Sequence, residues 1–294
     1  MQNTTLFAAR NGLRIAGACG QKVMTGMMMR RCLRMTKLTN SNYFSTDANK
    51  SYWSVSSFKA FDRCEASGLA QVRGQYERPE TDALLIGSYV DAYFTGDFDR
   101  FQAEHEEQMW TKKGTLYAKY EQANKIINAV ECQPLMMEYL DGEKQVIRTG
   151  NLFGVDWKIK MDVFRDGERI VDLKCVKDFE PLYKEGFGRL NWIEYWGYDI
   201  QGAVYQKIEQ ISSQREEPLP FYIVAVTKEK VPDIAVIRLP QHVLDTALKI
   251  VESKIDKFDL VKSGDIPPKR CEKCEWCKST KVLTEPSVYE SEEP

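Results

Sequence analysis

Residues 154–175 read GVDWKIKMDVFRDGERIVDLKC, and this stretch carries the clearest structural pattern of the chain. Its two flanks are rich in β-branched residues and alternate apolar with polar side chains, and Asp166-Gly167 interrupts them. This pattern predicts a β-hairpin with its turn at Asp166-Gly167. Because side chains two positions apart in a strand share a face, we expect Asp172 and Lys174 to point together while Leu173 turns into the core.

The same hairpin carries two acids and a lysine that we expect on one face. Asp162 lies across the hairpin from Asp172, provided that residues 165–168 form an odd-length loop or a bulge. A two-residue turn would instead put the two carboxylates on opposite faces of the sheet. Two carboxylates and an ammonium on one concave face suit a Mg²⁺ site with a lysine beside the attacking water. The alternative is a surface hairpin with scattered charges.

The order of the motifs resembles that of a known superfamily. Asp162 followed at close range by Asp172-Leu173-Lys174 resembles the core signature of the PD-(D/E)XK nucleases. Residues 198–205 (YDIQGAVY) resemble the helix motif of their RecB-like branch, in which a Gln and a Tyr face the active site. The first motif is similar to residues 84–91 (LLIGSYVD), and the start of such domains to residues 52–64 (YWSVSSFKAFDRC). The nearest likeness, over roughly residues 38–280, is the phage and prophage exonuclease VIII (RecE-type) group.

The resemblance implies an α/β fold with a mixed central β-sheet flanked by helices, the restriction-endonuclease-like PD-(D/E)XK core. It further implies that the ligands of the cation are Asp162, Asp172 and the carbonyl of Leu173. Lys174 would position or deprotonate the attacking water, and its pKa beside Mg²⁺ should be lowered. Gln201 would orient the water or the phosphate.

Two further features of the resemblance leave alternatives open. Asp91 stands where relatives usually carry His, so it would be another metal ligand, or else an ordinary surface acid on a helix. Tyr198 or Tyr205 would stack on a base or shape the substrate channel, or else pack between helix and sheet.

The function that the resemblance implies is a Mg²⁺-dependent (or Mn²⁺-dependent) exonuclease. It would hydrolyse phosphodiester bonds of linear double-stranded DNA from its ends, in phage or prophage recombination or repair in the bacterial cytoplasm. A single-strand annealing protein is the candidate partner. The alternatives are a catalytically silent DNA-end binding or recombination scaffold protein, and a structural zinc protein whose acids merely solvate a hairpin. The intact set of Asp162, Asp172 and Lys174 favours the enzyme.

Four cysteines have the placement of metal ligands. Cys271, Cys274 and Cys277 form C-x₂-C-x₂-C, and Cys64 lies far upstream. In a reducing compartment such spacing indicates metal. The arrangement resembles RecB-like iron–sulfur nucleases, AddB among them, where one early and three late cysteines, often spaced C-x₂-C-x₅-C, hold a [4Fe–4S] cluster. Zinc is the alternative, because four-cysteine sites bind it equally well. We expect the four thiols to converge.

Charge is distributed unevenly along the chain. Residues 1–45 hold seven cations and no acid, which leaves 34 cations against 43 acids in the rest. Because phosphate neutralisation needs clustered Lys and Arg, nucleic-acid binding by this acidic body must be local, in a groove, and helped by metal. The acid-free N-terminus is typical of a mitochondrial targeting peptide or of a translated leader before a start at Met35, and we favour the leader.

We expect four segments along the chain. Residues 1–40 are a disordered leader or extension, 41–265 the nuclease domain, 266–280 a Cys-rich metal-binding segment, and 281–294 an acidic disordered tail. No apolar run is long enough to span a membrane, and no phosphate-binding loop of the G-x-x-x-x-G-K-[ST] type is present. The expected helices are 53–72, 81–94, 116–130, 193–211 and 242–261, and the expected strands are 143–149, 152–164, 169–176, 221–226 and 233–238.

Overall fold

The computed structural model describes residues 37–286, so that the expected leader up to residue 36 and the end of the expected tail lie outside it. A five-stranded sheet forms the centre, in the order β1-β2-β3-β6-β7. The first three strands form an antiparallel meander, β6 pairs parallel with β3, and β7 pairs antiparallel with β6. The strands are β1 (Glu143–Leu152), β2 (Val155–Arg165), β3 (Arg169–Val176), β6 (Phe221–Thr227) and β7 (Ile234–Arg238). The mixed sheet predicted from the sequence is confirmed.

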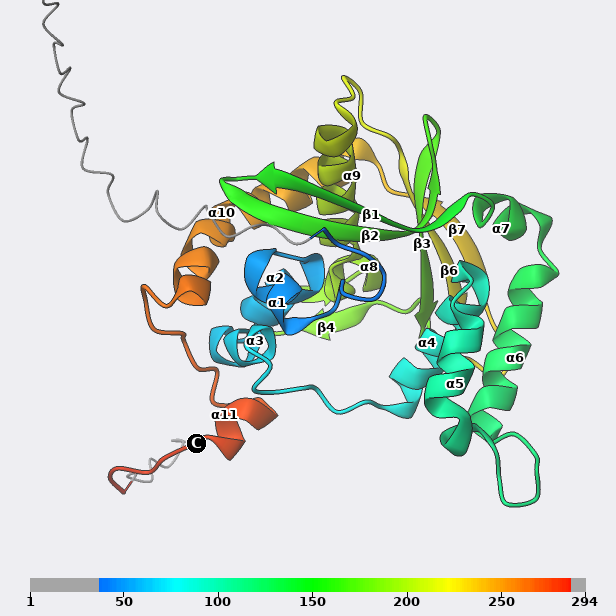
Figure 1. Ribbon diagram of the computed structural model, residues 1–294, viewed down its shortest axis with the longest axis horizontal. Coiled ribbons are helices and arrows are strands. Elements are labelled where there is room, and N and C mark those ends of the chain that lie inside the picture. The colour runs from blue at the N-terminus through cyan, green and yellow to red at the C-terminus, as the bar shows by residue number, and fades with distance from the viewer. Residues whose placement is uncertain (1–36, 287–294) are drawn as a thin grey trace, which may run out of the picture. The chain divides into compact units, whose positions relative to one another are not determined.

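Helices cover both faces of this sheet (Figure 1). One face packs against α4 (Asp82–Thr95), α5 (Phe98–Met109), α6 (Ala118–Glu131) and α7 (Pro134–Tyr139). The other face packs against α2 (Val55–Arg63), α3 (Glu65–Val72), α8 (Trp192–Trp196), α9 (Tyr198–Ser213) and α10 (Gln241–Ser263). The remaining elements are α1 (Thr46–Ser51), the small hairpin of β4 (Leu182–Lys184) and β5 (Gly188–Leu190), and α11 (Glu275–Ser279).

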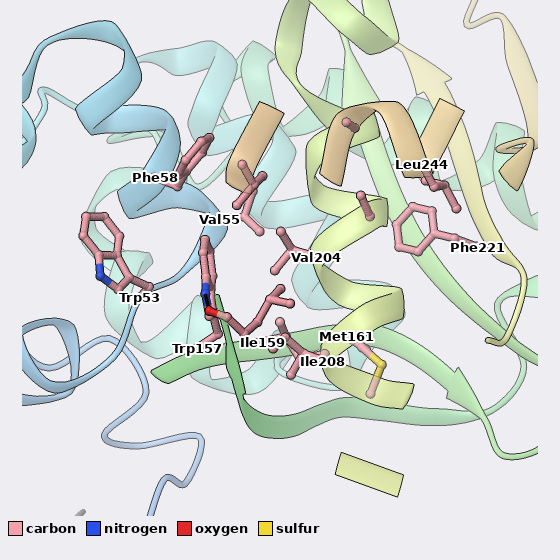
Figure 2. Close-up of a cluster of buried hydrophobic side chains, with 14 of the residues drawn as sticks. Trp53, Val55, Phe58, Trp157, Ile159, Met161, Val204, Ile208, Phe221 and Leu244 are labelled. Carbon is pink, nitrogen blue, oxygen red and sulfur yellow. Dashed lines mark hydrogen bonds between the residues drawn. The ribbon is translucent and has the colours of Figure 1, made fainter. Parts of the chain in front are cut away.

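Figure 2 shows the core between the sheet and the second group of helices, where Trp53, Phe58 and Trp157 lie near one another. Trp53 and Trp157 are at most 1% exposed. Trp53 also extends the sheet, because its amide donates to the Asp156 carbonyl (2.7 Å) and its carbonyl accepts from the Lys158 amide (2.8 Å). This contact covers an edge of β2 that β3 leaves unpaired.

The hairpin between β2 and β3 has the odd loop that the candidate site requires. Arg165 pairs with Arg169, so that three residues form the loop. The Glu168 amide donates to the Arg165 carbonyl at 3.0 Å, so that Gly167 is the third residue of a β-turn, and its φ of +74° is the positive value that a type II turn requires there. Extending the register by one pair puts Asp162 opposite Asp172. The odd-length loop that we expected is therefore confirmed.

Several helices depart from their predicted bounds. The helix expected over 53–72 breaks at Cys64, whose φ and ψ of −166° and 111° are those of extended backbone. The helix expected over 193–211 breaks at Gly197, which has a φ of +65°. The segment expected to be a loop around Pro181 contains the β4–β5 hairpin, and α5 and α7 were not predicted. No helix within residues 37–286 is long and apolar enough to cross a membrane.

The close approach of α9 to the sheet depends on Gly202. A Cβ added there would lie 2.8 Å from a ring carbon of Phe221 and 2.9 Å from a methyl group of Leu244. We therefore expect Gly202→Ala to lower the free energy of unfolding by about 1–3 kcal/mol through overpacking. The control is Gly87→Ala in α4, where a Cβ meets no atom within 4 Å, so that the change should be neutral or stabilising. Equal urea denaturation midpoints for Gly202→Ala and wild type would contradict this packing.

A half-buried lysine, Lys262, should make the stability of the fold depend on pH. Lys262 Nζ donates to the Tyr52 carbonyl (2.7 Å) and lies 4.5 Å from the Trp53 ring centroid. Burial lowers the pKa of Lys262 from 10.5 to about 7, although the carboxylate of Asp259 opposes the shift. Between these two pH values the unfolded chain holds the proton that the folded chain has lost. The free energy of unfolding contributed by Lys262 therefore rises as the pH rises through this window.

The test compares wild type with Lys262→Met by chemical denaturation at pH 7 and pH 9.5. We expect the gain in stability between the two pH values to be smaller in the variant. An identical gain in both proteins would show that Lys262 does not titrate in this range.

Candidate active site and cysteine cluster

The candidate active site lies where β2 and β3 separate. The β2–β3 ladder contains three pairs, from Arg165–Arg169 to Val163–Val171, and ends just before the two acids. Beyond that point β1 and β2 run away from β3 (Figure 1). We call this point of separation the fork, and Asp162 and Asp172 are the first residues past it.

An irregularity in β2 directs Asp162 to this point. Met161 and Phe164 belong to one core and Val163 to the other, so the regular alternation of the strand shifts at Asp162. Gln145 of β1 lies opposite Asp162 and has a φ of +55°. The pair of Gln145 and Asp162 is missing from the β1–β2 ladder. Local disruptions of this kind often redirect a side chain beside an active site.

The Asp162 carboxylate binds the main chain of the opposite strand. Its Oδ2 accepts a hydrogen bond from the Leu173 amide at 3.0 Å. The Leu173 carbonyl lies 3.5 Å from Lys174 Nζ, while the Leu173 side chain is buried with the helices of the other face. The main chain of Leu173 is therefore directed at the site, as its expected role as a carbonyl ligand requires.

Asp172 is almost fully buried, with 1% of its surface exposed. Its Oδ1 accepts a hydrogen bond from Gln201 Nε2 at 2.6 Å, which ties β3 to α9. Its Oδ2 forms an ion pair with Lys174 Nζ, but it receives no hydrogen bond of regular geometry from the described residues. A buried carboxylate oxygen with unused acceptor capacity is suited to a cation.

Electrostatics also fit a cation at this point. Burial, and then the nearby charges of Asp172 and Asp91, hold the pKa of Asp162 well above its usual range. The pKa of Asp91 is raised to about 6, mainly by burial and further by Asp172, although Lys174 opposes the rise. The negative charges of the three acids repel one another, and the single charge of Lys174 offsets only part of this repulsion. A divalent cation would stabilise the ionised carboxylates further.

Lys174 behaves differently from the expectation. Burial alone lowers the pKa of its ammonium, but the carboxylates of Asp172 and Asp162 outweigh burial and leave the pKa above its usual value. We expected Mg²⁺ to lower the pKa of Lys174, whereas the protein groups alone raise it. The reason is the ion pair with Asp172, which sequence reasoning did not include.

The four predicted cysteines converge. The Sγ atoms of Cys64, Cys271, Cys274 and Cys277 all lie within 4.8 Å of one another. Cys64 Sγ is 3.6 Å from Cys277 Sγ, and Cys271 Sγ is 3.9 Å from the same atom. The amides of Cys274 and Cys277 donate to the sulfurs of Cys271 and Cys274 at 3.3 and 3.5 Å. Such N–H···S contacts stabilise thiolates, the form in which cysteine binds metal.

The break between α2 and α3 creates the first ligand of this cluster. Cys64 sits at the break, and the Ala66 amide beyond it donates to the Lys269 carbonyl at 3.1 Å. Glu65 adds a second link, since its Oε2 accepts from the Lys269 amide at 2.8 Å. The start of α3 therefore holds the chain that leads into the cysteine trio. Among residues 37–286, no other set of three or more Cys, His, Asp or Glu ligand atoms is gathered this closely.

Residues 54–280 match the family described as "PDDEXK-like domain of unknown function (DUF3799)". The chain belongs to this family. The resemblance to PD-(D/E)XK nucleases drawn from Asp162, Asp172 and Lys174 is thereby confirmed at the level of the superfamily.

A solved structure supports the same conclusion. It is a crystal structure of a protein from Eubacterium rectale described as a "Putative exonuclease", 42% identical to this chain, with a TM-score of 0.81. The similarity covers 86% of this chain and 96% of that one. A second solved structure, described as SSO0001, matches at 11% identity and a TM-score of 0.25, over 66% of this chain and 84% of that one. No curated protein matches significantly.

Sequence reasoning missed one residue that lies beside the candidate site. Lys59 of α2 reaches the site, where its Nζ donates to the Trp196 carbonyl at 2.9 Å and lies 5.3 Å from the Tyr198 ring centroid. Its only signal in the sequence was its place in the stretch 52–64 that resembles the start of such domains. That stretch has no charge pattern that would have singled out Lys59.

The two tyrosines considered for the substrate channel have different surroundings. Tyr198 is half-buried, and two lysines, Lys59 and Lys174, lie 5.3 and 5.2 Å from its ring centroid. Tyr205 instead packs edge-on against Phe221, with ring centroids 6.3 Å apart, and burial raises its pKa well above the usual range. Tyr198 thus faces the two lysines, whereas Tyr205 packs between helix and sheet and lies near enough to Asp172 and Asp162 for their charges to raise its pKa further.

Proposed function

We propose that this protein is a Mg²⁺-dependent or Mn²⁺-dependent exonuclease that hydrolyses phosphodiester bonds of linear DNA. One observation carries the proposal: Asp162, Asp172, Lys174 and Gln201 meet where β2 and β3 separate, with Gln201 Nε2 2.6 Å from Asp172 Oδ1. The description of the Eubacterium rectale relative supports action as an exonuclease. A phage or prophage setting, a bacterial cytoplasmic location and a single-strand annealing partner extend the proposal.

The residues present can hold the cation and organise the reaction around it. The carboxylates of Asp162 and Asp172 and the carbonyl of Leu173 would bind the ion. Asp91 would either be a further ligand or influence the ion through its charge without binding it. A cation held by these residues would supply neutralisation of the charge on the scissile phosphate and a water of lowered pKa. Lys174 would donate a hydrogen bond to the attacking water and hold it in line. Gln201 keeps the Asp172 carboxylate in one orientation.

The alternative of a catalytically silent DNA-end binding or scaffold protein agrees less well with the site. A protein that only binds DNA does not require a buried acid such as Asp172, which the Gln201 amide and the Lys174 ammonium hold in place. Burying the Asp172 carboxylate costs stability unless its partners offset the cost, and the presence of this set therefore favours catalysis.

We further propose that the four cysteines bind a metal, and that the ion is a single zinc. Four sulfurs about 2.3 Å from one tetrahedral ion lie about 3.8 Å apart. The separations of 3.6 and 3.9 Å at Cys277 agree with this value. The thiols around a [4Fe–4S] cluster each bind a different iron and would lie further apart.

Removing the central groups should abolish cleavage. Asp172→Asn and Lys174→Ala should each lower the rate of Mg²⁺-dependent degradation of end-labelled linear DNA by about 10²-fold or more. The thermal melting curve should stay cooperative. Circular DNA should be spared by the wild type, and chelator should stop the reaction.

The matched control is Asp99→Asn, an exposed acid of α5, which should keep wild-type activity. Retained cleavage by either Asp172→Asn or Lys174→Ala, in protein free of host nuclease, would rule out the assigned roles. If the wild type binds DNA but leaves it intact with Mg²⁺ and with Mn²⁺, the scaffold alternative holds.

The cysteine cluster should contribute to folding. Cys64→Ala should lose the metal and lower the melting temperature by about 5 °C or more, because the ion ties α3 to the C-terminal segment. Elemental analysis of the colourless wild type should find about one zinc per chain. Cys132→Ala, at an exposed free thiol, should change neither property. Brown protein with about four irons would show a [4Fe–4S] cluster instead.

A further inference from the structure

We propose that Lys59, beside Lys174 and Tyr198, forms an anion site that binds a phosphate of the DNA strand next to the scissile one. The proposal rests on the function proposed above, and it adds a substrate-positioning residue from α2. That helix lies outside the fork and carries none of the ligands proposed for the cation.

The contacts of Lys59 hold its ammonium at the site. Its Nζ donates to the Trp196 carbonyl at 2.9 Å, at the end of α8. Its aliphatic stem passes close to Gly197, where an added Cβ would lie 3.0 Å from Lys59 Cδ. The break between α8 and α9 thus provides both the acceptor and the space for this lysine.

The charge of Lys59 lacks a direct counter-ion. Among residues 37–286 no carboxylate lies within 4.0 Å of its Nζ, whereas Lys174 is paired with Asp172. Asp172 and Asp199 attract Lys59 at longer range, and Lys174 and Arg63 repel it. Burial and then repulsion from Lys174 lower the pKa of Lys59 to about 8. A partly desolvated ammonium near a second ammonium is stabilised when an anion binds between or beside them.

A nucleic-acid phosphate is the anion that this position fits. Lys59 and Lys174 both lie at the ring of Tyr198, within 5.3 Å of its centroid. Lys174 belongs to the reaction centre, so an anion held by Lys59 lies beside the scissile group. A DNA strand supplies a phosphate on each side of the one that is cut. Because the body of the chain is acidic, binding depends on such local cations.

The test measures binding of a fluorescent linear duplex by anisotropy across a salt series, with Ca²⁺ in place of Mg²⁺. Lys59→Met keeps the stem and removes the charge. It should weaken binding about 5–10-fold and lower the slope of log affinity against log salt by about 0.9, the value of one phosphate contact. Lys59→Arg should restore the slope. Lys249→Met, an exposed lysine of α10, should leave affinity and slope unchanged.

In cleavage assays with Mg²⁺, Lys59→Met should raise KM about 5–10-fold and leave kcat within about twofold. A wild-type salt slope in Lys59→Met, or a fall in kcat with KM unchanged, would overturn the assignment. If the Met variant melts early, Lys59→Gln and Lys59→Arg are compared instead, and equal slopes in the two would overturn it. Absence of DNA binding by the wild type would overturn it too.

The binding assay also separates this proposal from the proposed nuclease activity. Lys59-dependent binding without cleavage would contradict the nuclease alone. Cleavage with Lys59-independent binding would contradict the phosphate site alone.

Discussion

The separation of β2 from β3 immediately after the Val163–Val171 pair organises the candidate active site. Where the ladder ends, the Leu173 amide loses a strand partner and takes the Asp162 carboxylate instead. The same separation exposes an edge of β2, which Trp53 covers, and leaves space for α9 to bring Gln201 to Asp172. One break in hydrogen bonding thus brings the acids together and admits the groups that surround them.

Features with a fixed short-range period could be predicted from the sequence. Alternation in β3 gave the shared face of Asp172 and Lys174 and the inward direction of Leu173, because side-chain direction in a strand follows from position alone. The odd loop followed from the requirement that both acids share a face. The convergence of the four cysteines was also predicted and is confirmed. It could be predicted because cysteines spaced like metal ligands must come together to bind one metal site.

Features decided by tertiary contacts could not be predicted. The break at Cys64 has no Pro or Gly to signal it and exists because α3 packs against the segment at Lys269. The shift in alternation at Asp162 depends on the unusual backbone of Gln145 in the neighbouring strand. Lys59 comes to the site through the arrangement of α2 and α8, and the raised pKa of Lys174 follows from its ion pair. Local pattern carries no information about any of these.

The claim that the fork between β2 and β3 binds a divalent cation is tested most directly by anomalous diffraction from crystals soaked in Mn²⁺. We expect an anomalous peak bounded by the carboxylates of Asp162 and Asp172 and the Leu173 carbonyl, and we expect it to be absent in Asp172→Asn crystals of the same form. A peak at another position, or no peak at the fork at saturating Mn²⁺, would contradict a cation site there.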